Sequence, residues 1–305
     1  MSGGAESGAV TTAPDHLKTR RGGVRDVATL PRVRAALSGL GALAAGGLAW
    51  GWFEAGWVRL RTLEVPLPGL PPELDGLRVA HLSDFHLGPP SRGAVAAGRA
   101  AAWVQERRPD LTALSGDLLT RPSGEPLLRD LVARLPNCYA ILGNHDFAIS
   151  RDPGARRSYL NELAPATLLS DNGVFTELRG RRIYLAGSDP RSRFVRSRPR
   201  ARELAVGRDQ AELRILLCHY PLQVDTLPPG AFDLVLAGHM HDGQICIPFP
   251  GGKLRLAHMA APYNAGVYRT PGGVLHVSPG LGTTFVPFRF AARPEATELT
   301  LRSLP

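Results

Sequence analysis

The stretch Tyr139-Ala140-Ile141-Leu142-Gly143-Asn144-His145-Asp146 passes from apolar residues directly into four polar or turn-forming ones. A short apolar run that ends in Gly, Pro or Asp is typical of a buried strand. No hairpin continuation follows, so the polar residues are expected at the end of the strand, not in a turn between paired strands. This position makes them candidates for a functional site.

The same arrangement occurs at four other places in the chain. Each is an apolar run followed by Asp or His: residues 77–82 before Asp84-Phe85-His86, 111–114 before Gly116-Asp117, 215–217 before His219, and 234–237 before Gly238-His239-Met240-His241. In open α/β sheets, ligands bind in the crevice beyond the strand ends. Five such ends predict one shared site.

The polar side chains at these ends form a set of metal ligands. Carboxylate, amide and imidazole groups bind divalent Mn, Fe or Zn, and the candidates are Asp84, His86, Asp117, Asn144, His219, His239 and His241. Two divalent ions about 3.5–4 Å apart activate a water molecule and bind both oxygens of a phosphoryl displacement. These ligands suffice for two ions if Asp117 bridges them. We therefore expect two divalent ions, whose identity the sequence leaves open.

Each motif alone has an ordinary structural explanation. An Asp-X-His triplet after a strand occurs in many proteins, Gly-Asp is a turn dipeptide, and Gly-His-Met-His is compatible with a solvated loop. The conjunction of all five, in order, favours a metal site. The other histidines, His16, His81, His258 and His276, have no partner at ligand spacing in the sequence.

In this order the motifs resemble those of the calcineurin-like metallophosphoesterases, and within them the bacterial membrane-associated subgroup. Residues 65–71 and 278–283 also resemble segments of that subgroup, so the likeness runs from about Leu63 to Leu301. The resemblance implies a phosphoesterase with a dinuclear metal centre and a bridging hydroxide as the nucleophile.

The resemblance also implies a role for each residue. One ion takes Asp84, His86, Asp117 and His241, and the second takes Asp117, Asn144, His219 and His239. His145 is the implied acid or hydrogen-bond donor near the leaving oxygen, with Asp146 orienting its ring. Where we expect glycine after the last histidine pair, this chain has Asp242, whose carboxylate either perturbs metal preference or points to solvent. We favour solvent.

The composition is compatible with one large α/β core. The chain has 305 residues, of which 44% are hydrophobic, and α/β folds of this size form single domains. Cys138, Cys218 and Cys246 are odd in number and far apart. They therefore predict no disulfide framework and no CxxC metal motif.

The net charge of +9 comes from two local features. Residues 1–62 carry +4, the six arginines in residues 191–202 carry +6, and the rest of the chain carries −1. Because the body is nearly neutral, nucleic-acid binding by the whole protein is not expected. The arginine stretch has three interpretations: attraction of substrate phosphate, a solvated loop, or contact with anionic lipid headgroups.

The N-terminal segment has the features of a membrane anchor. Residues 1–34 form a basic tail that begins small and polar, and the nineteen residues 35–53 carry no charge, a length that crosses a bilayer. Trp50, Trp52 and Trp57 cluster at the far end. We predict a single-pass anchor over residues 35–58, with the catalytic domain outside the cytoplasm. A cleaved export signal and a helix packed on the soluble domain are the alternatives.

Beyond the anchor, residues 59–76 contain four prolines and predict an extended connector, and residues 77–305 the catalytic domain. Helices are expected over residues 91–106, 125–134 and 154–163. After residue 167 we expect strands, including a hairpin around Arg179-Gly180-Arg181. This order predicts a mixed α/β fold, a four-layer αββα sandwich of two mixed sheets with helices outside.

Three functions fit the sequence. The leading one is a membrane-anchored, metal-dependent phosphoesterase that acts on a phosphorylated small molecule or a lipid-linked substrate. The second is a pyrophosphatase acting on a nucleotide-linked lipid of the UDP-diacylglucosamine type. The third is a binding module that has lost its chemistry, which is disfavoured because no ligand position is missing and His145 is present.

Overall fold

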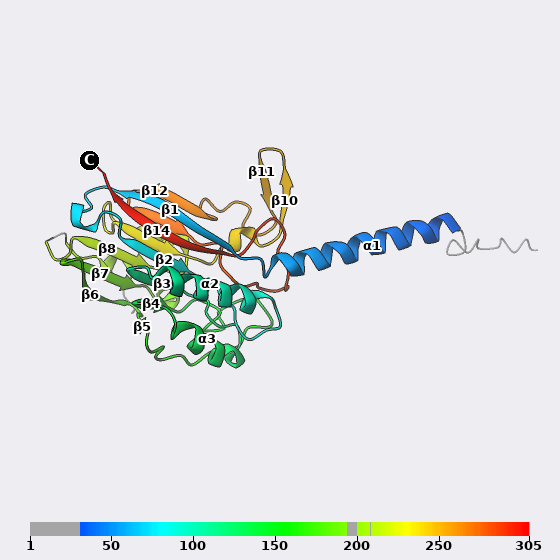
Figure 1. Ribbon diagram of the computed structural model, residues 1–305, viewed down its shortest axis with the longest axis horizontal. Coiled ribbons are helices and arrows are strands. Elements are labelled where there is room, and N and C mark those ends of the chain that lie inside the picture. The colour runs from blue at the N-terminus through cyan, green and yellow to red at the C-terminus, as the bar shows by residue number, and fades with distance from the viewer. Residues whose placement is uncertain (1–30, 194–199, 208, 305) are drawn as a thin grey trace, which may run out of the picture. The chain divides into compact units, whose positions relative to one another are not determined.

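The computed structural model describes residues 31–193, 200–207 and 209–304 of the chain (Figure 1). Most of the predicted N-terminal tail, residues 1–30, lies outside this part. The chain divides into two compact units, Met1–Ala45 and Gly46–Pro305. Within the described residues, the α-helices are α1 (Pro31–Glu54), α2 (Gly93–Arg107) and α3 (Glu125–Val132).

The second unit is built on two six-stranded mixed sheets. The first sheet has the order β1 (Arg59–Leu67), β14 (Glu295–Ser303), β2 (Arg78–Leu82), β3 (Leu111–Ser115), β4 (Cys138–Ile141) and β5 (Thr167–Leu168). The second has the order β12 (Gly266–Thr270), β13 (Gly273–Val277), β9 (Leu234–Ala237), β8 (Leu213–Leu217), β7 (Arg181–Gly187) and β6 (Asn172–Leu178). A separate hairpin pairs β10 (Cys246–Phe249) with β11 (Gly252–Arg255). The predicted mixed α/β fold with two packed sheets is confirmed.

The core lies in three layers. Between the sheets, Leu111 and Ile141 of the first pack against Ile215 and Leu234 of the second. The strands β3, β8 and β9 are buried along their whole length, which explains why they read as continuous apolar runs. Helices α2 and α3 cover the outer face of the first sheet with small and branched apolar residues, Ala96, Ala97, Ala100, Val104, Leu128 and Leu131.

The outer face of the second sheet has a different cover. Residues of the 3₁₀-helices η5 (Ala201–Leu204) and η6 (Pro221–Thr226) pack there, together with the segment around Tyr263. In the described part of the chain, the outer helical layer over this sheet is therefore made of 3₁₀-turns, not of α-helices.

The predicted connector, residues 59–76, is wrong for its first half. Residues 59–67 form β1, which pairs in parallel with β14 from Arg59 opposite Glu295 to Leu67 opposite Ser303. Alternate residues Val65 and Leu67 are fully buried. Pro66 fits because β1 is an edge strand, where a missing N–H group costs no ladder bond.

The predicted helix over residues 154–163 is also wrong, because this segment has no helical turn. Its backbone N–H groups bond to distant carbonyls instead: Arg156 N donates to Thr120 O at 2.8 Å, and Ser158 N to Asp146 O at 2.8 Å. Ten residues form at best a marginal helix alone, so tertiary hydrogen bonds decided the conformation. The hairpin prediction is correct, since β6 and β7 are antiparallel and joined at Arg179-Gly180.

Residues Arg34–Glu54 of α1 form the one described helix that is long and apolar enough to cross a membrane. Only 6% of the 18-residue apolar stretch within this helix is buried. Its last residues, from Gly46, belong to the same compact unit as the sheets. Arg289 N donates to Gly51 O at 3.0 Å, and Ala292 N donates to the buried Glu54 carboxylate at 2.9 Å.

Candidate metal centre

The five predicted strand ends converge. The neighbouring strands β2, β3 and β4 are parallel, and so are β8 and β9 in the other sheet, so the carboxyl ends of each group lie at one edge. The two edges meet directly, because His219 Nδ1 lies 2.9 Å from Ser115 O. The loops after these strands carry every predicted site residue.

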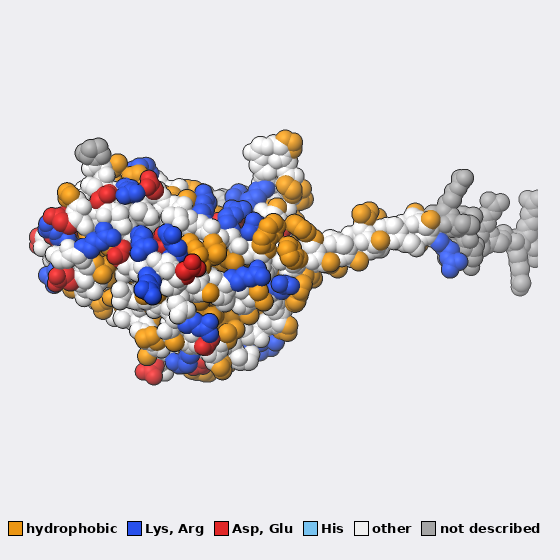
Figure 2. Space-filling model, viewed as in Figure 1, with side chains coloured by type: hydrophobic (Ala, Val, Ile, Leu, Met, Phe, Trp, Pro, Cys, Tyr) orange, Lys and Arg blue, Asp and Glu red, His pale blue; other side chains and the backbone are white. Residues whose placement is uncertain are grey.

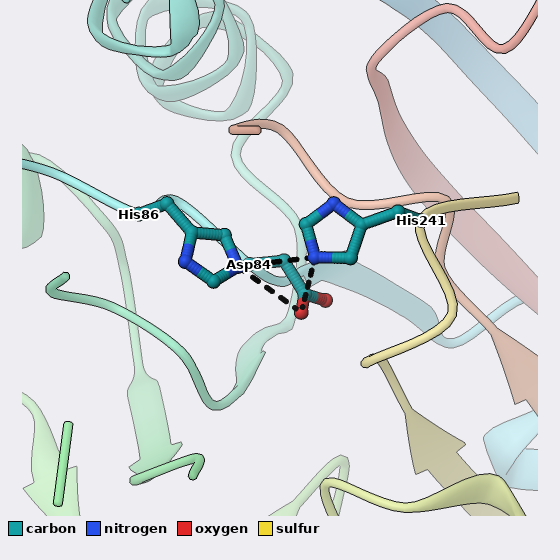
Figure 3. A group of neighbouring side chains, drawn as sticks. All are labelled: Asp84, His86 and His241. Atoms are coloured by element: carbon teal, nitrogen blue, oxygen red, sulfur yellow. Dashed lines mark hydrogen bonds and ion pairs between the residues drawn. The ribbon is translucent and has the colours of Figure 1, made fainter. Parts of the chain in front are cut away.

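The first group is Asp84, His86 and His241 (Figure 3). The Asp84 carboxylate lies between the two imidazoles, with Oδ1 at 3.3 Å from His241 Nε2 and 3.7 Å from His86 Nε2. The two Nε2 atoms are 3.0 Å apart. All three side chains are almost fully buried.

The carboxylate of Asp117 faces this group and a second one. Its Oδ2 lies 3.6 Å from His86 Nε2 and 3.2 Å from His219 Nε2. Its Oδ1 accepts a hydrogen bond from the His145 backbone N–H at 2.8 Å, which fixes the carboxylate between the two sets of histidines.

The second group contains His219, His239 and Asn144. Asn144 Oδ1 is 3.0 Å and His239 Nδ1 is 3.3 Å from His219 Nε2. The structure thus brings all seven predicted ligands together in two groups that share the neighbourhood of Asp117.

The backbone at these residues is unusual. Asp84, His86, Asp117, His239 and His241 all have positive φ, between 48° and 74°. Non-glycine residues rarely adopt this region, and such outliers gather at functional sites where the surroundings hold them. The left-handed turns direct each side chain into the crevice immediately after its strand.

Neighbouring polar groups orient the site side chains. Ser83 Oγ donates to Asp84 Oδ2 at 2.5 Å, and His86 Nδ1 lies 2.9 Å from Thr120 Oγ1. The fully buried Arg289 lies 3.3 Å from His241 Nδ1 and donates to the carbonyls of Gly282 and Pro279. Because Thr120 and Arg289 contact the Nδ1 atoms of His86 and His241, the Nε2 atoms of both rings face the crevice.

The charges in the crevice are strongly coupled. Although burial opposes ionisation, the neighbouring His241 lowers the pKa of Asp84 well below its usual value, and His219 does the same for the pKa of Asp117. Although burial opposes protonation, Asp117 raises the pKa of His219 to about 9. Burial lowers the pKa of His239 to about 3, with repulsion from His219 adding to it.

These residues fit divalent cations. Neighbouring donors around an ion with bonds of about 2.0–2.2 Å lie roughly 3.0–3.6 Å apart, and the separations in the two groups run from 3.0 to 3.7 Å. Two buried carboxylates also require positive charge nearby. The donor set of carboxylate, amide and imidazole suits Mn, Fe or Zn.

The comparisons with known proteins agree with this geometry. The family model for the calcineurin-like phosphoesterases matches residues 77–243, which is more than half of the chain. The chain belongs to the calcineurin-like phosphoesterase family. Its members are hydrolases that act on phosphoric esters, so the family expectation from the motifs is confirmed.

Three relatives illustrate the likeness. A bovine "transmembrane protein with metallophosphoesterase domain" is 31% identical over 262 residues, covering 80% of this chain and 57% of its own length. The metallophosphoesterase YkuE of Bacillus subtilis is 29% identical, covering 86% of this chain and 94% of its own length. Phosphodiesterase YaeI of Escherichia coli is 25% identical, with coverages of 64% and 72%. The chain spans little more than half of the bovine relative.

One expected role within this family site is wrong. Asp146 does not orient the ring of His145, because its carboxylate accepts the backbone N–H groups of Leu118, Leu119 and Gly143 at 2.7–3.2 Å. Asp146 thereby ties together the loops that carry Asp117 and Asn144. Burial, and then the charge of Asp117, raise the pKa of Asp146 to about 7.

His145 is held by a residue that sequence reasoning missed. Its Nε2 lies 2.8 Å from Ser150 Oγ, while its buried Nδ1 has no hydrogen-bond partner among the described residues. Burial lowers the pKa of His145 to about 4. The ring lies close to both ligand groups, at 4.5 Å from that of His86 between centroids.

The side chain of Asp242 does not point to solvent, since only 13% of it is exposed. It forms salt bridges with Lys253 and Arg255 of β11, so our solvent interpretation is wrong. Its φ is 51°, a conformation that glycine adopts freely, which explains why glycine is expected there.

The site opens into a cavity of about 670 Å³. Its polar lining includes the site residues Asp117, Asn144, His145, His239 and His241 together with Ser150, Arg151 and His258, and its apolar lining includes Ile149, Ile245, Leu256, Phe285 and Val286. Spacing along the sequence gave no sign of His258, whose ring lies 5.5 Å from that of His239.

Described members of the arginine stretch lie at neighbouring cavities. Arg191 is paired with Asp189 at 2.6 Å. Arg200 and Arg202 line a cavity of about 260 Å³ that shares Tyr220 with the metal cavity. Residues 194–199 of this stretch lie outside the described residues.

Proposed function

We propose that this protein is a phosphoesterase with two divalent ions, one held by Asp84, His86, Asp117 and His241 and the other by Asp117, Asn144, His219 and His239. The observation that carries the proposal is the position of Asp117 Oδ2, which lies within 3.6 Å of histidines from both groups. A carboxylate in that position serves as a bridging ligand.

Two ions held by these residues would activate a water molecule and would stabilise the charge on the attacking and leaving oxygens. The chain's residues supply the rest. Thr120 and Arg289 fix the rings of His86 and His241, and Asp146 holds the two ligand loops against each other. His145, whose buried Nδ1 has no hydrogen-bond partner among the described residues, is placed to donate a hydrogen bond to a phosphate or leaving-group oxygen.

The protein is proposed to be anchored in the cell membrane by α1, with the catalytic unit outside the cytoplasm. Support comes from the apolar span Arg34–Glu54, from relatives named as transmembrane proteins, and from the basic residues that precede the span. The contacts of Gly51 and Glu54 with residues 289–292 favour an uncleaved segment over an export signal. A reporter fused after Pro305 should be active only outside the cytoplasm, and a reporter active inside would reverse this orientation.

The apolar side chains that line the cavity favour a second candidate substrate. Ile245, Leu256, Phe285 and Val286 suit the lipid part of a nucleotide-linked lipid of the UDP-diacylglucosamine type, in which the scissile bond is a pyrophosphate.

Metal analysis of the purified protein and a substrate panel test the proposal. We expect two equivalents of metal, and hydrolysis of phosphodiesters ahead of phosphomonoesters, since the Escherichia coli relative is named a phosphodiesterase. Faster hydrolysis of lipid-linked pyrophosphates would favour the second candidate. One equivalent of metal, or no hydrolysis by fully loaded protein, would overturn the proposal.

A further inference from the structure

The hairpin β10–β11 has one entirely apolar face. Its register places Ile247 opposite Leu254, with Phe249 two residues further along the same face. These three side chains are exposed by 53%, 48% and 55%. Figure 2 shows hydrophobic side chains along the projecting hairpin and around its root. Among the described strands the hairpin pairs with no other, and such a two-stranded hairpin gains little stability from apolar residues that are exposed to water.

The opposite face of the hairpin fixes its orientation. Lys253 and Arg255 point from that face to the carboxylate of Asp242, and Lys253 Nζ also donates to Ala291 O at 2.8 Å. The apolar face is therefore held outward by specific ionic contacts and does not result from a loosely placed loop.

The root of the hairpin is joined to the end of the apolar helix. Cys246 N donates to Phe290 O at 2.9 Å, and Arg289 N donates to Gly51 O at 3.0 Å. The ring of Phe290 lies so close to Gly51 that a Cβ there would be 2.4 Å from it. All of these residues belong to the unit Gly46–Pro305, so one short hydrogen-bonded path connects the helix end to the hairpin.

The helix end carries the side chains of a membrane interface. Trp50, Phe53 and Trp57 form a cluster with ring centroids 5.6–6.2 Å apart, and each is more than one third exposed. Trp52 meets Phe288 at 6.5 Å. Tryptophan gathers at the boundary between lipid and water, where its ring is apolar and its N–H group wet.

From these observations we propose that the apolar face of β10–β11, with the exposed Phe285 that lines the same cavity as Ile245 and Leu256, is a second membrane contact that inserts into the lipid surface near Gly46–Glu54, the end of α1. Strands of four residues extend about 10–14 Å at roughly 3.4 Å per residue, which is long enough for their apolar side chains to reach the depth of about 5–10 Å at which interfacial segments insert. Because Ile245 and Leu256 at the base of the hairpin also line the metal cavity, this contact sets the cavity mouth against the bilayer. The inference depends on the membrane span and not on the metal chemistry.

The test uses full-length protein in phospholipid vesicles. Phe249→Cys and, separately, Leu254→Cys are labelled with a fluorophore whose emission shifts to the blue in apolar surroundings. The three native cysteines are buried and do not compete for the label. Phe175→Cys on β6, 41% exposed in the parent protein, is the matched control because it lies on an outer strand of the second sheet.

We expect blue-shifted emission at both hairpin positions, quenched by lipid-attached nitroxides at least about twofold more than at the control. Equal emission and quenching at the hairpin and the control would overturn the inference. A blue shift that lipid nitroxides do not quench and that fades as the protein is diluted would also overturn it, because a second copy of the chain would then cover the face. Hydrolysis is not measured, so failure here leaves the proposed phosphoesterase function untouched.

Discussion

The two sheets contribute different chemistry to one crevice. The strand ends of the first sheet supply the oxygen donors Asp84, Asp117 and Asn144, with His86 as their single imidazole, whereas those of the second supply imidazoles alone, from His219, His239 and His241. All the negative charge among the seven therefore comes from one sheet. The carboxylates are held by N–H groups, Asp84 by that of His239 and Asp117 by that of His145.

The difference has an energetic consequence. Two ionised carboxylates buried in one crevice are costly without positive charge nearby, and the raised pKa of His219, about 9 beside Asp117, shows how strongly these carboxylates favour a cationic neighbour. If the proposed two-ion function is right, the carboxylates of the first sheet supply the negative charge that attracts the cations, and the histidines of the second sheet complete the coordination. Substitutions on the two sheets should accordingly differ in metal stoichiometry.

The largest effect should follow Asp117→Asn. An amide cannot bridge two cations, so both ions should be lost, and with them several kcal/mol of transition-state stabilisation, about 10³-fold or more in turnover. His239→Ala, at the end of a strand of the second sheet, should remove only one equivalent of bound metal. Metal content and turnover measured together check both. Two bound metals with full activity in the Asn variant would exclude a bridging role.

A smaller effect separates catalysis from metal binding. His145→Ala should retain both metals and lower turnover by roughly 10²–10⁴, the usual contribution of a positioned donor. Asp146→Asn should instead lower the free energy of unfolding by about 1–3 kcal/mol, because at least one buried N–H group loses its acceptor. Thermal denaturation distinguishes the two. Parallel loss of metal in the His145 variant would make this residue a ligand.

Sequence predicted which side chains gather in the crevice because they follow apolar strands at fixed positions, and the chemistry of Asp84 or His219 is visible in the residue itself. Arg289, Ser150 and Thr120 were missed because their roles depend on contacts made by folding. Arg289 lies 48 residues from His241 in the chain, and only a buried guanidinium beside that ring reveals its role.

The errors in the fold have the same origin. Residues 59–67 were assigned to a connector because proline discourages strands, but pairing with β14 at a sheet edge tolerates Pro66. Residues 154–163 were assigned to a helix, yet Arg156 and Ser158 donate to carbonyls of other loops. In both cases hydrogen bonds to residues far away in the chain decided the backbone conformation. The local sequence pattern does not reveal such bonds, and they outweighed the local preference for a connector or a helix.

Arg289→Lys tests whether Arg289, which would not itself bind metal, holds the ring of the proposed ligand His241 in place. Lysine keeps the charge but lacks the planar set of donors that reaches Gly282, Pro279 and Ala292. The His241 loop should then be less well placed, with a loss in metal affinity of roughly 10- to 100-fold. Excess metal should restore activity, which a general folding defect would not permit. The control is Arg293→Lys, because Arg293 contacts Trp57 and does not line the cavity of the site.

The smallest effect concerns long-range charge. Arg200 and Arg202 line the cavity that shares Tyr220 with the metal cavity, and Tyr220 lies 4.7 Å from His239 between ring centroids. If these arginines attract anionic substrate, replacing both with Gln should raise KM by about two- to fivefold at low salt. The difference should vanish at physiological ionic strength, where screening acts beyond about 8 Å. The control pair Arg129→Gln, on α3, and Arg134→Gln, just beyond the end of α3, removes the same charge away from both cavities and should leave KM unchanged. A KM effect that persists at high salt would indicate direct contact with phosphate, whereas no effect at low salt would make the arginines a solvated surface that the crevice does not use.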